Sequence, residues 1–362
     1  MDILPVHTRV RDIVDQGVQA AMFGDKGVLN RRWPTPQNRH RPWWTNTGAN
    51  KKDRHDDAIN GRRASYGSPW PSAQVQMGQV AGLRLHRSWL ISFLAFDAIP
   101  IVSGFYHSFT KWNAMGDARW IGVNNYAEAL NRDPLFWKSV SNTLYYIGLS
   151  VPLGIVAAFV LAMMLNSRVR GMTIYRTIYY LPSVVPIVAA VIVWVFIFEA
   201  RRGILNWAIE LVGLKPIRWL ADPDWAMMAL IIMSLWGIGA TMIIFLAGLQ
   251  SISQEMYEAA EVDGANGMQK LFRITIPLMT PTIFFTLILN LVNAFQSFSN
   301  AFILTGGGPN NATLLYMIHI YTNAFGYFRM GYASALSALL FVVVFGVTLL
   351  VYRTSDRWVY YS

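Results

Sequence analysis

Long apolar segments alternate with short polar ones from about residue 88 to the end of the chain. Six windows are apolar over about 20 residues, and they cover roughly residues 88–110, 142–165, 177–198, 225–249, 282–304 and 332–352. Windows two to six contain no Asp, Glu, Lys or Arg strictly inside them. Only segments that pair their own backbone amides can cross a bilayer. The pattern therefore predicts an all-α membrane protein with six transmembrane helices.

The first window is the weakest, because Asp97 and Pro100 lie inside it. We expect a structural role for Asp97, with Tyr106 or a neighbouring span satisfying its carboxylate; the alternatives are a wet cavity or a shifted span. Prolines and glycines also interrupt later windows, and membrane helices tolerate such breaks where neighbours satisfy the freed backbone groups. These residues are Pro152, Pro182, Pro186, Gly237 and Gly239.

Composition supports the membrane assignment. The chain is 54% apolar and 14% charged, against about 25% charged in soluble domains. Fourteen of its 30 Lys and Arg residues lie in residues 1–87. The net charge of +10 could indicate nucleic acid, but the basic residues flank apolar segments and do not form a stripe among aromatic residues. Membrane lipid is the expected anionic neighbour, and nucleic acid is not an expected partner. There is no cysteine, which excludes disulfides and thiolate metal sites.

Residues 1–83 form a polar, basic tail without helical or strand periodicity, and residues 84–362 form the expected transmembrane domain. Low hydrophobicity with high charge predicts disorder in the tail. Two alternatives stay open: a short recruitment segment, or a natural start at Met77.

A polar stretch at residues 250–281 separates the fourth and fifth windows. Ser253 can cap a helix from Gln254 to about Val262, and Asp263-Gly264 is a turn signal. A second helical stretch should run over 266–275, with Pro277 stopping or kinking the chain before span five. The acidic residues Glu258, Glu261 and Asp263, beside Ala259 and Ala260, suit docking into a basic cleft of another protein. The alternative is a solvated acidic loop.

The residues of this stretch resemble the EAA loop of binding-protein-dependent ABC importer permeases. The shared pattern is Glu-Ala-Ala, three residues, Gly, nine residues, Ile, one residue, a hydrophobic residue and Pro; Ile276 stands where Leu is usual. The matching coupling residues are Glu258, Ala259, Ala260, Asp263 in the turn, Gly264, Ile274 and Pro277. The resemblance implies a cytoplasmic loop that inserts into a groove of an ATPase subunit, where Glu258 pairs with a basic residue. Both termini would then be cytoplasmic, which the distribution of Lys and Arg near the spans alone does not decide.

A second match, Leu304–Pro309 with Thr313 and the run Gly331–Ala335, resembles the carbohydrate-uptake branch, in particular the larger permease of maltose and glycerol-phosphate importers. The resemblance covers about 84–362. Gly306, Gly307 and Gly308 are not a phosphate loop, because no Lys-Ser or Lys-Thr follows them; we expect a flexible turn leaving the membrane.

No phosphate-loop pattern exists in the chain, so it is expected to be a transport subunit without enzyme activity or a cofactor of its own, ATP being bound by a partner. The resemblance implies an inner-membrane assembly of two ATPase copies, this subunit, a second permease and an extracytoplasmic solute-binding protein.

Polar residues in the fifth window predict the solute pathway, since intramembrane polar groups often face one. Asn290, Asn293, Ser297 and Asn300 follow a spacing that places them on one helix face, with Gln296 beside them and Phe295 and Phe298 close by. Amides and aromatic rings suit a sugar, and the lack of fixed charge favours a neutral solute. The alternative is that these amides bond neighbouring helices. Ordinary packing is favoured for Trp194 and Trp236.

Two other function classes compete. An ion-coupled secondary transporter needs intramembrane acids or bases, and only Asp97 is available. A membrane-embedded enzyme needs a nucleophile with its base, or a metal cluster, whereas His107 and His319 are isolated in the sequence; no metal site is expected.

Overall fold

The structure is a computed structural model that describes residues 89–167 and 171–360. The predicted tail at 1–83 and the alternative start at Met77 lie outside the described residues. The chain divides into two units, Met1–Met77 and Gly78–Ser362, and the description below concerns the second. Within the described residues, four helices are long and apolar enough to cross a membrane, or up to six spans if each of two bent pairs counts as one.

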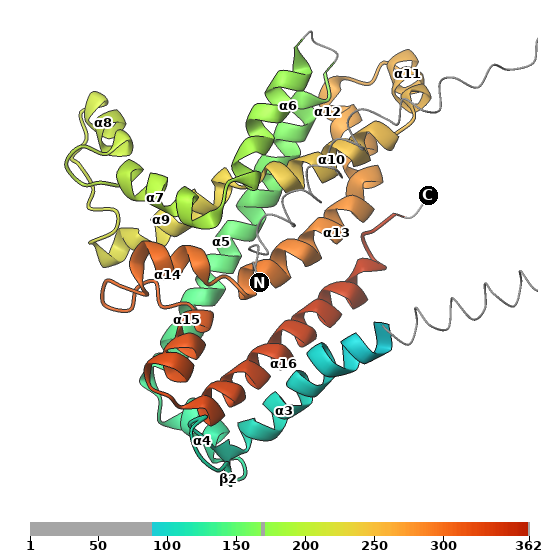
Figure 1. The fold of residues 1–362 in the computed structure, drawn as a ribbon. Helices are drawn as coiled ribbons and strands as arrows, with labels where there is room; N and C mark the ends of the chain where they lie inside the picture. Colours follow the sequence, from blue (N-terminus) through green and yellow to red (C-terminus); the bar gives the residue numbers. More distant parts are fainter. Residues whose placement is uncertain (1–88, 168–170, 361–362) are drawn as a thin grey trace, which may run out of the picture. The chain divides into compact units, whose positions relative to one another are not determined.

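The spans are carried by helices in the order expected from the apolar windows (Figure 1). A helix over Trp89–Ser108 contains η2 (Leu94–Ala98) and α3 (Ile99–Ser108). The elements that follow are β1 (Thr110–Lys111), β2 (Arg119–Trp120), α4 (Asn124–Asn131), α5 (Pro134–Leu165), α6 (Met172–Tyr180), η3 (Leu181–Val184), α7 (Ile187–Ile197), α8 (Ile204–Leu211), α9 (Pro223–Trp236) and α10 (Gly239–Ser251). The remainder are α11 (Gln254–Val262), α12 (Gly267–Lys270), η4 (Leu271–Thr275), α13 (Ile276–Phe295), α14 (Ser299–Thr305), α15 (Tyr316–Tyr321), η5 (Thr322–Gly326) and α16 (Met330–Ser355).

The predicted all-α fold gains one small exception, an antiparallel pair of two-residue strands in which Thr110 faces Trp120. Asp97 does not behave as expected. Its side chain is exposed, and no hydrogen bond or ion pair joins it to Tyr106 or to any other described residue.

α5 is longer than its apolar window because polar groups define both of its ends. Asp133 caps the helix by accepting a hydrogen bond from the Leu135 amide at 2.9 Å, and Pro134 occupies the first turn, where no amide hydrogen is needed. At the other end Arg176 donates to the carbonyl oxygen of Leu165 at 2.9 Å. The helix of 32 residues is about 48 Å long at 1.5 Å per residue, so it extends beyond the hydrocarbon core.

Two spans are broken where the sequence places proline and glycine. The segments Met172–Val184 and Ile187–Ile197 meet at 100°, and Pro223–Trp236 and Gly239–Ser251 meet at 46°. Pro186 disfavours a helical residue before it, and Val185 is extended. The start of α10 packs closely on the end of α6, because a Cβ on Gly239 would lie 2.4 Å from the Tyr179 carbonyl oxygen, an approach that only glycine allows.

Pro277 neither ends nor separates the fifth span. One helical segment runs over Gly267–Phe295, and a π-helical turn at Leu271–Thr275 precedes the proline. In this turn the Ile276 amide bonds the Leu271 carbonyl, so the wider turn accommodates the missing amide of Pro277. The predicted window 282–304 is also interrupted: α13 ends at Phe295, and the short helix α14 follows after three residues.

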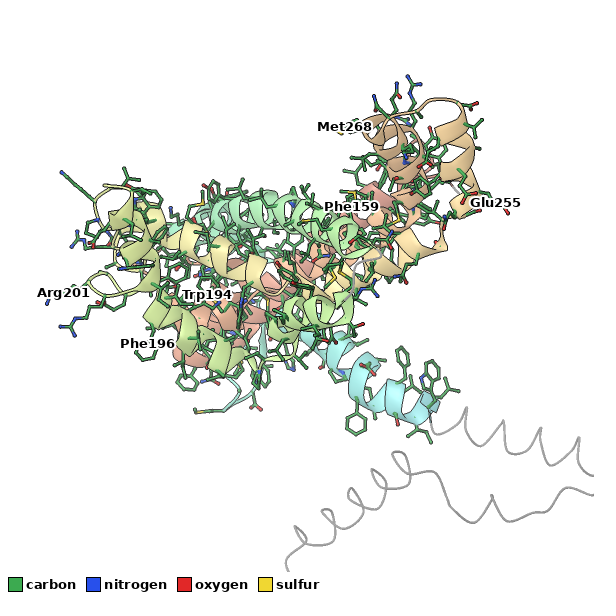
Figure 2. The ribbon with its side chains drawn as sticks, turned by 90° about the horizontal axis from the view of Figure 1, so that it is seen from above. Phe159, Trp194, Phe196, Arg201, Glu255 and Met268 are labelled. Carbon is green, nitrogen blue, oxygen red and sulfur yellow. The ribbon has the colours of Figure 1, made fainter. Side chains whose placement is uncertain are left out.

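α5 forms the centre of the described unit and packs against α9, α10 and α13, while α3 packs against α16 (Figure 1). Small residues permit close packing: Ala158 and Ala162 of α5 are fully buried against Met242 and Phe245 of α10. Large apolar side chains point outward elsewhere, as Phe196 shows in Figure 2. Such outward apolar surface is typical of helices that face lipid or partner helices.

Buried polar side chains join the start of α5 to α15 and α16. His319 Nε2 lies 2.9 Å from Asp133 Oδ2, and the Tyr332 hydroxyl donates to the same oxygen at 2.6 Å. Arg329 pairs with Glu128 and stacks over the Tyr332 ring at 4.4 Å. We call these five residues the end network; it ties three segments that are far apart in sequence.

Burial determines the charge state within this network. Desolvation lowers the pKa of His319 from its ordinary value, although the carboxylate of Asp133 partly offsets it. Burial alone would raise the pKa of Asp133, but the hydrogen bond from Tyr332 and the contact with His319 hold it below 3.8. A neutral imidazole therefore donates from Nε2 to a carboxylate, and its Nδ1 can accept from the Asn323 amide at 3.4 Å.

Acidification should destabilise the fold through His319. Because its pKa is below the ordinary value of 6.5, the unfolded chain binds a proton that the folded chain does not, so stability falls as the pH drops below 6.5. The loss is at most about 1.4 kcal/mol per pH unit. We expect the denaturation midpoint of the purified protein to fall between pH 7 and 5, and His319→Gln, which keeps a donor for Asp133, to flatten that slope. An equal slope in His319→Gln would contradict this account.

Candidate functional site

A cavity of about 400 Å³ opens where the three helix breaks come together. Its walls come from α5, α7, the α9–α10 break, α13 and α14. The polar lining residues are Tyr146, Ser150, Ser234, Thr241, Asn290, Asn293, Ser297, Ser299 and Asn300. No Asp, Glu, Lys or Arg side chain lines it.

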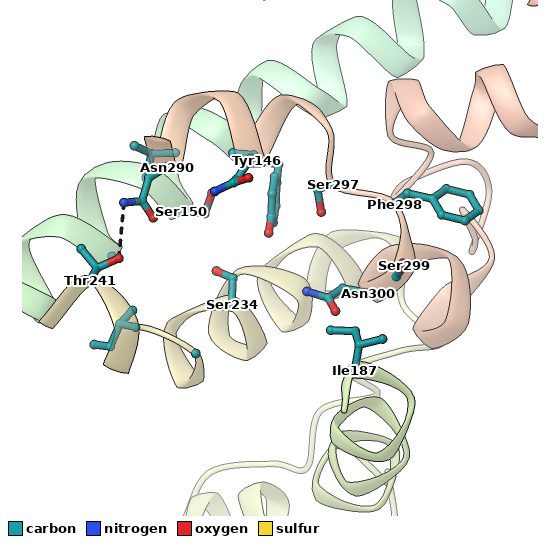
Figure 3. Close-up of a pocket in the computed structure, with 16 residues that line it drawn as sticks. Tyr146, Ser150, Ile187, Ser234, Thr241, Asn290, Ser297, Phe298, Ser299 and Asn300 are labelled. Carbon is teal, nitrogen blue, oxygen red and sulfur yellow. Dashed lines mark hydrogen bonds between the residues drawn. The ribbon is translucent and has the colours of Figure 1, made fainter. Parts of the chain in front are cut away.

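Local backbone geometry places these side chains. Tyr146 and Ser150 lie one turn apart on the same face of α5. The interruption after Phe295 turns the chain, so that Ser297 and Asn300 approach the cavity from a different direction than Asn290 (Figure 3). In Figure 3 the Tyr146 hydroxyl and the Asn300 amide both point into the space that Ser234 faces from α9.

Some of the polar atoms in this site are already paired and some are not. Asn290 donates to the Thr286 carbonyl at 2.8 Å and lies 3.4 Å from the Thr241 hydroxyl of α10, so it does bond a neighbouring helix. In contrast, Ser150 Oγ and Asn300 Oδ1 are buried without a hydrogen-bond partner among the described residues. Buried polar atoms are normally paired, so these two atoms are suited to bind a polar ligand.

The structure brings together four of the five predicted pathway residues. Asn290, Asn293, Ser297 and Asn300 line the cavity, whereas Gln296 does not. The prediction that they share one helix face was wrong, because the helix that carries Asn290 and Asn293 ends at Phe295.

Of the two aromatic side chains expected close to the pathway residues, only Phe298 lies at the cavity. Phe298 lines the cavity, close to the pathway residues as expected, although its ring stacks on Phe302 with ring centroids 4.9 Å apart and points away from the middle of the cavity (Figure 3). Phe295 is buried in the core. Tyr146 is a second aromatic residue in the lining. The sequence pattern did not predict Tyr146, Ser150, Ser234 or Thr241 as pathway residues. Their signal was weak, since isolated polar residues in two separate windows, 142–165 and 225–249, do not reveal which helices meet.

The Gly306–Gly308 run does not line the cavity, but it is not a loose turn either. Gly306 ends α14 in the left-handed conformation, with φ of 62°. The fully buried Thr313 donates to the Gly308 carbonyl at 2.6 Å and bonds the Thr305 hydroxyl at 2.7 Å. These bonds hold the loop against the end of α14.

A second candidate site is the helical hairpin at 254–275. Ser253 caps α11, as predicted, by accepting from the Glu255 amide at 3.2 Å. Gly264 has φ of 76°, and the amides of Gly264 and Ala265 bond the carbonyls of Glu261 and Ala260. This is the pattern by which a left-handed glycine ends a helix, so Gly264 makes the predicted turn.

Side chains hold the two arms of this hairpin together. Lys270 pairs with Glu261 at 2.7 Å, and the Tyr257 hydroxyl lies 3.0 Å from the Thr275 hydroxyl. Asn266 and Gln269 cap the second arm reciprocally. The hairpin is therefore a folded helical element whose two arms are bonded to each other, and not merely a solvated loop.

The outer surface of the hairpin mixes acidic and apolar side chains. Glu258, Ala259 and Asp263 are exposed, while Ala260, Ile274 and Pro277 are half-buried. The large apolar residues on the same hairpin are open to solvent: Met256, Val262, Met268 and Phe272 are 44%, 89%, 65% and 61% exposed. Figure 2 shows Glu255 and Met268 pointing outward from this hairpin, far from Arg201. Exposed apolar groups of this kind mark protein–protein contacts.

Within the described residues, no group of three His, Cys, Asp or Glu side chains could hold a metal ion. The uncharged cavity and the projecting hairpin are thus the two features that call for a functional explanation.

Residues 150–359 match the family described as the binding-protein-dependent transport system inner membrane component. The chain belongs to this family. It is a multi-pass membrane protein and the permease component of an ABC importer, the part that provides the passage and lacks a nucleotide-binding domain.

Individual relatives agree. The chain is 39% identical over 295 residues to the probable ABC transporter permease protein YesP of Bacillus subtilis, covering 80% of this chain and 95% of the relative. It is 33% identical to the trehalose/maltose transport permease MalF of Thermococcus litoralis, covering 71% and 87%. A crystal structure of a bacterial ABC transporter that imports the acidic polysaccharide alginate matches with a TM-score of 0.69 and 26% identity, covering 79% of this chain and 98% of that one.

Two neighbouring substitutions test the cavity assignment. Asn300→Leu removes an unpaired buried acceptor and should raise the KM for solute uptake about five- to tenfold, because a hydrogen bond contributes about 1 kcal/mol. Gln296→Leu, four residues earlier and outside the cavity, should change the KM less than about twofold. Uptake by proteoliposomes measures both, and equal effects would contradict the assignment.

Proposed function

We propose that this permease conducts a neutral sugar or oligosaccharide. The observation that carries the proposal is a cavity whose polar lining consists only of hydroxyl and amide groups. Hydroxyls and amides both donate and accept hydrogen bonds, which matches the hydroxyl groups of a sugar. The Tyr146 ring offers an apolar surface for the sugar's C–H face.

Relatives support this substrate class and also limit it. Two relatives are named as permeases of a trehalose/maltose and an arabinooligosaccharide transport system. The structurally similar importer handles an acidic polysaccharide. A carboxylated sugar would enter this chain's cavity without meeting an Arg or Lys, and burying an unpaired charge is costly.

The substrate class can be tested with a panel of sugars. In the assembled transporter we expect uptake of maltose, trehalose or a neutral oligosaccharide to exceed uptake of an alginate oligosaccharide by about tenfold or more. Competition against labelled neutral sugar gives the ratio. Preferential uptake of the acidic sugar would overturn the proposal.

We also propose that residues 250–281 form the EAA-type coupling hairpin that docks into an ATPase subunit. The motif residues Glu258, Ala259 and Gly264 support this, as do the rigid turn and the exposed apolar rim of the hairpin. The beginning of α3 and the end of α16 lie toward the same end of the helical unit as α11 and α12 (Figure 1), which supports a cytoplasmic location for both termini.

The proposed assembly contains two ATPase copies, this chain, a second permease and an extracytoplasmic solute-binding protein. A similar transporter has been crystallised with a periplasmic protein bound to an alginate pentasaccharide. Closure of the ATPase pair on ATP would move the docked hairpin and, through the continuous helix Gly267–Phe295, the α13 wall of the cavity. ATP then favours one conformation of the spans over the other.

The coupling role of the hairpin predicts a charge-reversal phenotype. Glu258 is exposed, and its bond to Gln254 at 3.0 Å lies within its own helix, so Glu258→Lys should leave the fold intact. Against a basic groove it should lower uptake at least about tenfold while ATP hydrolysis by the complex persists. The control is Glu210→Lys, an exposed acid on α8. Unchanged uptake in Glu258→Lys would remove the proposed role.

A further inference from the structure

Asn142 is a buried amide of α5 whose side chain reaches out of its own helix. It is 7% exposed, and its Nδ2 donates to the carbonyl oxygens of Asn311 at 2.8 Å and Leu314 at 3.1 Å. Both hydrogens of one amide group are thus used on two backbone carbonyls 169 and 172 residues away. Only a side chain with two donors on one nitrogen satisfies both.

The next residue strengthens the same link. Thr143 is 3% exposed; its hydroxyl accepts from the Tyr316 amide at 2.8 Å and donates to the Ser139 carbonyl at 2.8 Å. Two consecutive α5 side chains therefore bind the backbone between positions 311 and 316.

That backbone segment is in turn joined to α14. The fully buried Thr313 bonds the Gly308 carbonyl and the Thr305 hydroxyl, and Thr305 is the last residue of α14. α14 is the short helix that carries Ser299 and Asn300 to the cavity. A continuous series of hydrogen bonds thus runs from α5, through the loop 306–315, to α14.

The same face of α5 carries the opposite wall of the cavity. Tyr146 and Ser150 follow Asn142 at four and eight residues, so the three side chains are stacked along one side of the helix. Tyr146 and Ser150 line the cavity, whereas Asn142 and Thr143 do not.

We propose that Asn142 is a positioning residue that fixes the α14 wall of the cavity relative to the α5 wall, and so determines the affinity of the passage for its solute without touching the solute. Thr143 supports it. The inference rests on the proposed function only in its choice of solute, because the spacing of the two walls is a property of the chain itself.

Kinetics in the assembled transporter provide the first arm of the test. The probe is the neutral sugar that the unsubstituted transporter takes up best from the panel of maltose, trehalose and a neutral oligosaccharide. Asn142→Ala should raise the KM about tenfold and leave the maximal rate within about twofold. The matched control is Ser139→Ala. Ser139 is fully buried on the same helix, and its hydroxyl donates to the Phe136 carbonyl within α5, while its own carbonyl accepts from Thr143.

A gentler pair of variants covers the case in which Asn142→Ala does not fold. Thr143→Val keeps the shape of the side chain and removes the acceptor of the Tyr316 amide, so it should raise the KM about threefold. Thr143→Ser keeps the hydroxyl and should not raise it. An unchanged KM in both Asn142→Ala and Thr143→Val overturns the proposal.

Distances between labels provide the second arm, independent of any sugar. The chain has no cysteine, so spin labels can be placed on α5 at Leu153→Cys and on α14 at Ile303→Cys, positions that are 47% and 41% exposed, in a complex whose other chains carry no reactive cysteine. Asn142→Ala should shift or broaden the distance distribution, and Ser139→Ala should not. An unchanged distribution overturns positioning even if the KM rises. A wrong sugar assignment can be told apart from a wrong role for Asn142, because in that case the unsubstituted transporter itself takes up none of the sugars.

Discussion

A lipid environment offers no water to a broken helix, and this constraint governs the whole architecture. The chain interrupts three apolar segments, near Pro186, Gly237 and Phe295, and each interruption frees backbone groups that need partners. All three interruptions lie around one cavity, which is lined by side-chain amides and hydroxyls. Helix breaks that would be costly against lipid thereby create the polar interior that a solute passage requires. The close approach of Gly239 to the Tyr179 backbone packs the second of these breaks against the end of α6.

The hairpin at 254–275 and the cavity are connected by one continuous helix. One helical segment begins at Gly267 in the hairpin and ends at Phe295 beside the cavity, and the π-helical turn before Pro277 preserves its continuity. A rigid rod of this kind transmits displacement better than a hinge would. The end network of Asp133, His319 and their neighbours joins the start of α5 to α15 and α16. The two ends of the unit are therefore built differently: at one end the hairpin projects with exposed side chains, and at the other end the segments are bonded to one another.

The apolar windows predicted the order of the helical segments, since hydropathy measures what a bilayer selects. The described residues hold four helices long and apolar enough to cross a membrane, or up to six spans if each bent pair counts as one. The boundaries were less predictable, because α5 is extended by the Asp133 cap and α13 is ended by local backbone geometry. The motif residues Ser253 and Gly264 allowed the hairpin to be predicted closely, since capping and turn chemistry are local. The cavity was only half predictable. Asn290, Asn293, Ser297 and Asn300 share one segment, whereas Tyr146 and Ser234 join them only through the packing of separate helices, which a single sequence does not encode locally.

The pairing of α3 with α16 has a consequence for biogenesis. No residue in the most apolar window of the helix Trp89–Ser108 is buried, and among the described spans this helix packs mainly on α16. α16 is the last described span to leave the ribosome. The earliest of these helices must therefore persist in the bilayer without its main neighbour until translation of the chain is nearly complete, and its own apolar surface has to suffice as an anchor during that interval.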